Sequence, residues 1–186
     1  MQEDRIPAAR IALLATALIF LGHFAAYTYI TPYLEDRAHF GSSAVTLVLL
    51  GYGVAGLAGN FAAGAIIGSS LRAVYITAAI LVAATAVLLN TLTGAAPGVV
   101  VLVMLWGAAF GAVPLALQTW ILRAPPDAPE SGMALLVSVC QIALAAGSLI
   151  GGMAVDGYGA PAAFALGGTL ALLSAATQIF PRMSRV

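Results

Sequence analysis

The sequence contains few charged residues and few reactive side chains. Of its 186 residues, seven are Lys or Arg and seven are Asp or Glu, and all seven basic residues are arginines. Charged residues make up 8% of the chain, whereas an ordinary soluble domain has about a quarter. Together with a mean hydropathy of +1.04, this scarcity indicates that lipid, rather than water, surrounds most of the protein surface.

Several classes of function are disfavoured by what is missing. The net charge is zero and no basic stripe is present, so we expect no nucleic-acid partner. The single cysteine, Cys140, excludes a disulfide framework and a cysteine-based metal site. Without clustered His, Asp or Glu and without a phosphate-binding loop, we expect no metal, no cofactor and no catalytic residues. An intramembrane serine protease is disfavoured because Ser42, Ser43 and His39 fall in an expected outer loop.

Long uncharged intervals are abundant, and their lengths predict membrane spans. They lie between Arg10 and Glu35, Arg37 and Arg72, Arg72 and Arg123, Glu130 and Asp156, and Asp156 and Arg182. A helix needs roughly 20 apolar residues to cross the hydrocarbon. Four intervals therefore hold one crossing each, and the third holds two, separated by a turn at residues 90–98.

The sequence thus predicts an all-α, polytopic membrane protein in which residues 1–186 form a single six-helix bundle. The expected helices span residues 10–34, 45–67, 73–90, 98–123, 131–155 and 160–181. Membrane β-strands would alternate apolar and polar residues, and runs such as residues 78–84 do not alternate.

The arginines predict the orientation. With six crossings, six of the seven fall on one side of the membrane, namely Arg5, Arg10, Arg72, Arg123, Arg182 and Arg185, and only Arg37 falls on the other. Cytoplasmic loops carry the excess of basic residues, so we expect both termini in the cytoplasm and the chain in the inner, or plasma, membrane. A cleaved signal peptide is disfavoured because Glu3 and Asp4 interrupt a basic start and the first apolar run is too long.

Polar residues inside the spans mark a candidate solute pathway, because such residues usually face a cavity or another helix. The candidates are His23, Tyr27, Thr31, Asn60, Gln118 and Gln141. His23 could bind solute or relay a proton, or it could be a neutral residue bonded to a neighbouring helix. Asn60 and Gln141 have the same two interpretations. The third and sixth expected helices are blander, and we expect them to be lipid-facing supports.

Glycines at a spacing of four predict close helix packing. The pairs are Gly64 and Gly68, Gly107 and Gly111, and Gly147 and Gly151. Pro114 follows the second pair and could bend the fourth helix.

Three stretches resemble one family of transporters. Residues 22–34 read Gly-His-Phe-Ala-Ala-Tyr-Thr-Tyr-Ile-Thr-Pro-Tyr-Leu, residues 59–72 begin Gly-Asn and end Leu-Arg, and residues 151–159 contain Asp156 between glycines. They are similar to the seventh helix, the loop after the eighth, and the turn after the eleventh helix of drug and sugar efflux proteins in the major facilitator superfamily. The family usually has an Asp-Arg pair where this chain has Ser69 and Ser70, which leaves Arg72 as the gating-loop residue.

The resemblance implies one C-terminal half of a twelve-helix transporter, built as a 3+3 inverted repeat. It implies that helices one, two, four and five line a central cavity and that export proceeds by alternating access with proton antiport. Coupling within this chain would use His23 or Asp156.

We expect the cargo to be a small neutral or amphipathic solute. Besides the lipid bilayer, solute and protons, the expected partner is a second six-helix bundle, either another copy or a separate N-terminal half. A non-transporting fragment or membrane scaffold is the alternative.

Overall fold

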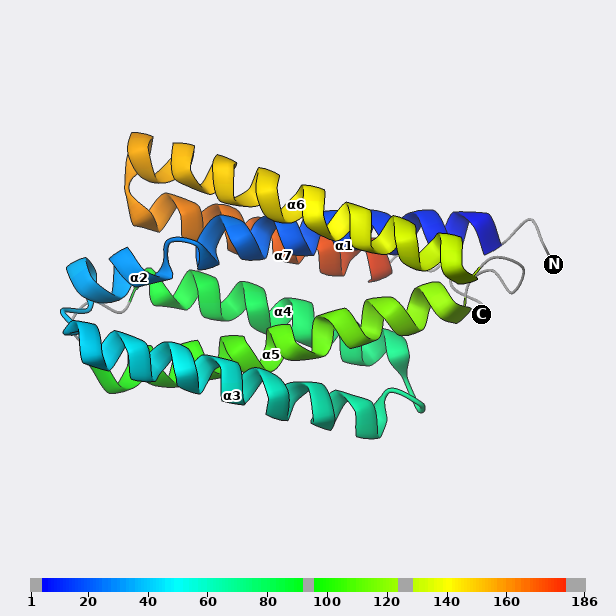
Figure 1. Ribbon diagram of the computed structural model, residues 1–186, viewed down its shortest axis with the longest axis horizontal. Coiled ribbons are helices and arrows are strands. Elements are labelled where there is room, and N and C mark those ends of the chain that lie inside the picture. Colours follow the sequence, from blue (N-terminus) through cyan, green and yellow to red (C-terminus); the bar gives the residue numbers. More distant parts are fainter. Residues whose placement is uncertain (1–4, 92–95, 124–128, 180–186) are drawn as a thin grey trace.

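The computed structural model describes residues 5–91, 96–123 and 129–179, and this part of the chain is helical, with no strand. Six long helices are joined by short connections (Figure 1). They are α1 (Arg5–Tyr27), α3 (Ser42–Ile66), α4 (Leu71–Leu89), α5 (Ala96–Arg123), α6 (Pro129–Tyr158) and α7 (Ala160–Ile179). Each contains a segment long and apolar enough to cross a membrane, so the predicted all-α polytopic fold is confirmed.

The first helix differs from its expected range of 10–34. It stops at Tyr27, a turn follows at Thr28 and Tyr29, and the chain continues as the short α2 (Ile30–Pro32) and the π-helical turn η1 (Tyr33–Arg37). Pro32 explains the break, since it has no N–H to bond the carbonyl of Thr28 and its ring disfavours a continuous helix.

Side chains at this break bind α6. The hydroxyl of Tyr29 donates to the carbonyl oxygen of Ser148 at 3.0 Å, and the hydroxyl oxygens of Thr28 and Ser148 are 2.8 Å apart. The turn between α1 and α2 is therefore held against the neighbouring helix.

The pairs of helices that pack together form a symmetric set. Helix α1 packs chiefly on α6 and α7, α5 packs chiefly on α3 and α4, and α4 packs on α7 (Figure 1). Exchanging α1 with α5, α3 with α6 and α4 with α7 leaves this set of pairs unchanged.

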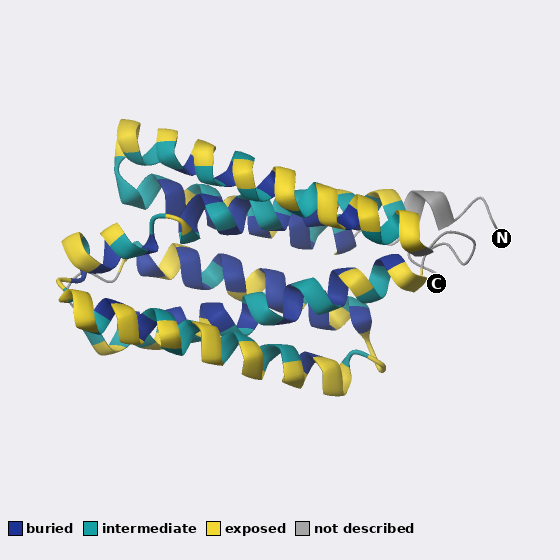
Figure 2. Ribbon diagram, in the orientation of Figure 1, coloured by how far each residue is buried: buried dark blue, intermediate teal, exposed yellow. Residues whose placement is uncertain are grey.

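Helices α3 and α6 lie on opposite sides of the bundle and are the most exposed (Figure 2). Only 11% and 17% of their spans are buried, against 44–50% for the other four. Helices α4 and α7, the third and sixth expected helices, are about half buried within this chain, and their role as lipid-facing supports stays a prediction. Their bland sequences are rich in alanines that pack into the core, such as Ala78, Ala79 and Ala171.

A buried hydrogen-bond network joins three core helices. The hydroxyls of Tyr75 on α4 and Ser174 on α7 are 2.6 Å apart, and Ser174 donates to the carbonyl oxygen of Ala15 on α1 at 2.7 Å. All these polar atoms lie where water is excluded, so the network both satisfies them and fixes the relative positions of the helices.

Four of the six predicted packing glycines lie at backbone crossings. A Cβ atom at Gly107 or Gly111 on α5 would overlap the carbonyl oxygen of Tyr52 or Gly56 on α3. On α6, a Cβ atom at Gly147 would overlap the carbonyl oxygen of Leu21 on α1. Gly151 meets the carbonyl oxygen of Ala25 in the same way.

Gly64 and Gly68 make no such crossing. The nearest atom to a Cβ at Gly64 would be Leu115 Cδ2 at 3.7 Å, and nothing lies within 4 Å of one at Gly68. The glycines of α3 that meet the backbone of α5 are Gly56, next to the carbonyl oxygen of Gly107, and Gly59, opposite that of Ala108. Spacing alone does not show which face of a helix meets a neighbour, so it did not identify these two glycines.

We predict that Gly111→Val lowers the free energy of unfolding by about 1–3 kcal/mol, because the added side chain must separate α3 from α5. Gly68→Val is the matched control and should change stability little, since the space around it is open. Unfolding by SDS titration in mixed micelles measures both. Equal losses in the two variants would contradict the role of the crossing.

Candidate functional site

A cluster of aromatic rings surrounds His23 at the junction of α1, α3 and α5. The side chain of His23 is 2% exposed. Its ring contacts five others, which with His23 itself we call the His23 cluster: Phe24 and Tyr27 on α1, Tyr52 on α3, and Trp106 and Phe110 on α5. Three helices thus converge on a single imidazole.

The rings are arranged in two ways around the imidazole. Phe110 is parallel to it, with ring centroids 3.3 Å apart and planes within 4°, and Tyr27 is also nearly parallel, at 5.2 Å and 16°. Trp106 approaches edge-on, with a centroid distance of 5.4 Å. Tyr27 and Trp106 lie within the range of about 4.5–7 Å preferred for aromatic pairs, whereas Phe110 lies face to face with the imidazole, closer than that range and with almost no offset. The imidazole is therefore tightly enclosed by rings.

The polar atoms of the cluster are only partly satisfied. The hydroxyl of Tyr52 lies 3.4 Å from His23 Nε2. In contrast, His23 Nδ1 and Trp106 Nε1 are buried and find no hydrogen-bond partner among the described residues. A buried polar atom without a partner costs about 1–3 kcal/mol. Among the described residues three side-chain atoms are in this state, and two of them lie in this cluster, the third being Asn90 Oδ1.

The other predicted pathway residues lie elsewhere. Thr31 is half-buried on α2, beyond the break of the first helix. The side-chain amide of Asn60 donates to the carbonyl oxygen of Gly111 at 3.1 Å, so Asn60 joins α3 to α5. Gln118 and Gln141 are exposed on α5 and α6. The structure therefore brings His23 and Tyr27 together and leaves the other four outside their cluster.

Sequence reasoning missed the two cluster residues on α5. Trp106 and Phe110 look like ordinary apolar residues of a span. One signal was present, because tryptophan in membrane proteins is usually found at the interfaces, whereas Trp106 is near the middle of a 28-residue helix and fully buried.

Arg72, the expected gating-loop residue, binds the end of α7. Its Nε donates to the carbonyl oxygen of Gln178 at 2.6 Å, and its Nη2 donates to that of Ile179 at 3.0 Å. These are the carbonyls that a helix end leaves without internal partners, and a cation there also favours the helix dipole. Arg72 thus connects the start of α4 to the last helix.

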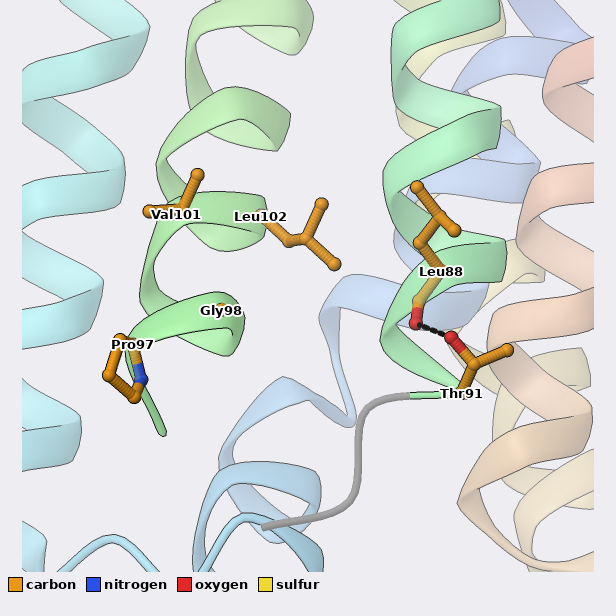
Figure 3. Close-up of a pocket in the computed structure, with 6 residues that line it drawn as sticks. All are labelled: Leu88, Thr91, Pro97, Gly98, Val101 and Leu102. Carbon is orange, nitrogen blue, oxygen red and sulfur yellow. Dashed lines mark hydrogen bonds between the residues drawn. The ribbon is translucent and has the colours of Figure 1, made fainter. Parts of the chain in front are cut away.

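An apolar pocket of about 420 Å³ lies between the end of α4 and the start of α5 (Figure 3). Its lining residues are Leu88, Thr91, Pro97, Gly98, Val101 and Leu102. The hydroxyl of Thr91 already donates to the carbonyl oxygen of Leu88 at 2.8 Å (Figure 3). The pocket therefore offers little to orient a polar solute, and none of the predicted pathway residues lines it.

The described ranges hold no group of three His, Cys, Asp or Glu side chains able to bind a metal ion. The groups that the His23 cluster offers to a ligand are its aromatic rings and its hydrogen-bonding atoms.

The chain is similar to efflux pumps. It is 36% identical over 173 residues to the purine ribonucleoside efflux pump NepI of Escherichia coli K12, an alignment that covers 91% of this chain and 43% of that protein. NepI of Salmonella enteritidis is 33% identical over 169 residues, with the same coverage. No family model matches the sequence.

A third relative has a different name. The chain is 32% identical over 179 residues to the transcription regulatory protein OpdE of Pseudomonas aeruginosa, covering 96% of this chain and 44% of that protein. This chain spans less than half the length of all three relatives. Those named as pumps are transporters rather than enzymes, in agreement with the expectation of a transporter rather than an enzyme.

We predict that Asn60→Leu lowers the free energy of unfolding by about 0.6–1.7 kcal/mol, the size of a hydrogen bond between helices in a membrane protein. Gln118→Leu, at an exposed position of α5, is the control and should lower it much less. SDS titration distinguishes them. A loss of solute binding by Asn60→Leu without a loss of stability would instead identify Asn60 as a pathway residue.

Proposed function

We propose that this chain forms one six-helix half of a major facilitator transporter, which exports small neutral or amphipathic solutes by alternating access and proton antiport. The observation that carries the proposal is its similarity to NepI efflux pumps along 91% of the chain. Because the chain spans 43% of those proteins, the proposal is of a half and requires a second bundle.

The packing order supports the 3+3 inverted repeat. The exchange that preserves the helix pairs relates α1, α3 and α4 to α5, α6 and α7, which are consecutive triplets of spanning helices. Since three crossings are an odd number, the second triplet begins on the opposite side of the membrane from the first. Repeats of inverted topology are the building units of this kind of transporter.

Polar groups on the outer faces support a second bundle. Gln141 on α6 and Gln118 on α5 are exposed within membrane-spanning helices. A side-chain amide facing hydrocarbon is unfavourable, so these faces fit a water-filled pathway or a contact with another bundle. The two halves of such transporters have the same orientation, and a twofold axis along the membrane normal would place another copy suitably.

The proposal also assigns residues for proton coupling and a class of cargo. Proton antiport within this chain would use His23 in the cluster or Asp156, which is exposed near the end of α6. The NepI relatives are named for purine ribonucleosides, which are neutral, hydroxylated solutes of the expected class.

A non-transporting membrane scaffold or regulator is the second candidate, and the name of OpdE favours it. The two candidates differ in one measurable property, because only a transporter moves solute in a saturable way.

The test combines native mass with transport. We expect the purified chain in nanodiscs to have twice the mass of the 18.8 kDa monomer, and proteoliposomes with an imposed proton gradient to move nucleosides saturably. Diluting the chain in lipid should abolish transport, because lone copies lack the second half of the pathway. Transport by vesicles that each hold one copy would contradict the requirement for two bundles, and a complete lack of transport by the dimer would favour the scaffold.

A separate test addresses orientation. In a Cys140→Ser background, we expect Ser42→Cys, at the start of α3, to react with an impermeant maleimide in intact cells. Ser69→Cys, between α3 and α4, should react only after permeabilisation, because both serines are exposed but lie at opposite ends of α3. The reverse pattern of labelling would place the termini outside the cell.

A further inference from the structure

The unpaired atoms of the His23 cluster determine which hydrogen-bonding groups a ligand must supply. Trp106 Nε1 carries a hydrogen and can only donate. We assign His23 the tautomer in which Nε2 accepts from the hydroxyl of Tyr52, so that the proton is on Nδ1. Both unpaired atoms, His23 Nδ1 and Trp106 Nε1, are then N–H donors. A ligand that satisfies them must present acceptors.

The remaining surfaces of the cluster are ring faces. Phe24, Tyr27, Tyr52 and Phe110 contact the imidazole through their rings, and Trp106 adds the indole. Stacking between aromatic side chains and a planar base contributes strongly to binding and does not depend on its exact substituents. A flat ligand is therefore favoured over a compact or branched one.

The cluster has no charged side chain, since its members are one histidine, two tyrosines, two phenylalanines and one tryptophan. A permanent charge bound here would lose its water without gaining a counter-ion from these residues. The ligand should therefore be uncharged.

One side of the cluster is better suited to open than the other. Phe110 is tightly stacked on the imidazole, whereas the ring of Tyr27 is 5.2 Å away and only half-buried. Tyr27 also contacts the half-buried Tyr52, with ring centroids 4.8 Å apart. Rotation of these two tyrosines would uncover the imidazole while Phe110 stays in place.

We infer that the His23 cluster binds the planar ring of an uncharged heteroaromatic solute, such as a nucleobase within a nucleoside. Tyr27 and Tyr52 move aside, the ring stacks within the cluster, and His23 Nδ1 and Trp106 Nε1 donate to its ring nitrogens or carbonyl oxygens. This assignment rests on the proposed transport function and names the part of the solute that the chain recognises.

The test is equilibrium binding of radiolabelled guanosine to the 186-residue chain in nanodiscs, which does not depend on transport. We expect guanosine to bind, and ribose and guanosine monophosphate to compete poorly, because the first lacks the ring and the second is charged. Trp106→Phe and His23→Phe keep an aromatic ring but remove the donors, and each should weaken binding roughly tenfold, the effect of one hydrogen bond.

Trp120→Phe is the matched control. It makes the same chemical change on the same helix, but its indole packs edge-on against Tyr75 outside the cluster, at 5.9 Å, so guanosine binding should be unchanged. Because the chain has two tryptophans, this variant also leaves Trp106 as the only one. Guanosine should then quench the tryptophan fluorescence of Trp120→Phe.

Stability separates recognition from a structural role. Trp106→Phe removes an unpaired donor, and this gain offsets the cost of the small cavity that the smaller ring leaves at a fully buried position. The empty protein should therefore unfold at about the same temperature as the original chain, even though it binds guanosine more weakly. Unchanged binding in both Trp106→Phe and His23→Phe, equal competition by ribose, or no guanosine binding by the original chain would overturn the assignment. If the chain binds guanosine but exports nothing, the binding assignment stands and the transport function is rejected. If it exports guanosine but neither variant weakens binding, the transport function stands and the binding assignment is rejected.

Discussion

The close approach of helix backbones at glycines is the constraint on which the rest of this structure depends. In lipid, burying apolar side chains gains little over leaving them in the bilayer, so helices associate through tight packing and hydrogen bonds. Gly111 lets α5 lie directly against α3, and Gly147 and Gly151 do the same for α6 against α1. Both pairs of helices are positioned by carbonyl oxygens that leave no room for a Cβ atom.

The His23 cluster depends on one of these crossings. Phe110 precedes Gly111, and Trp106 precedes Gly107, whose Cβ position meets the backbone of Tyr52. The residues that set the distance between α3 and α5 are thus adjacent to those that contact the imidazole. A change in the crossing would move Trp106 and Phe110 relative to Tyr52, so packing and recognition are coupled through a few residues of α5.

This coupling explains which features of the structure could be predicted from the sequence and which could not. The intervals between charges predicted six helices and most of their ends, because the length of a span is set by the bilayer. The polarity of His23 and Tyr27 marked their face of α1. The partners on α5 could not be predicted, since an apolar helix gives no sign of which face meets which neighbour. For the same reason, the spacing of Gly64 and Gly68 did not identify Gly59 as the glycine of α3 that lies against the backbone of α5 at Ala108.

The unpaired donors of the His23 cluster contrast with the satisfied hydroxyls elsewhere in the core. The hydroxyls of Tyr75 and Ser174 show that this core can satisfy its buried polar groups. His23 Nδ1 and Trp106 Nε1 are left unpaired in the same bundle, whereas a phenylalanine ring has no polar atom to leave unpaired. Polar groups retained at a cost in stability are characteristic of functional sites. The His23 cluster holds two buried donors without partners, so a solute that supplies acceptors there would gain hydrogen bonds that the protein itself does not make.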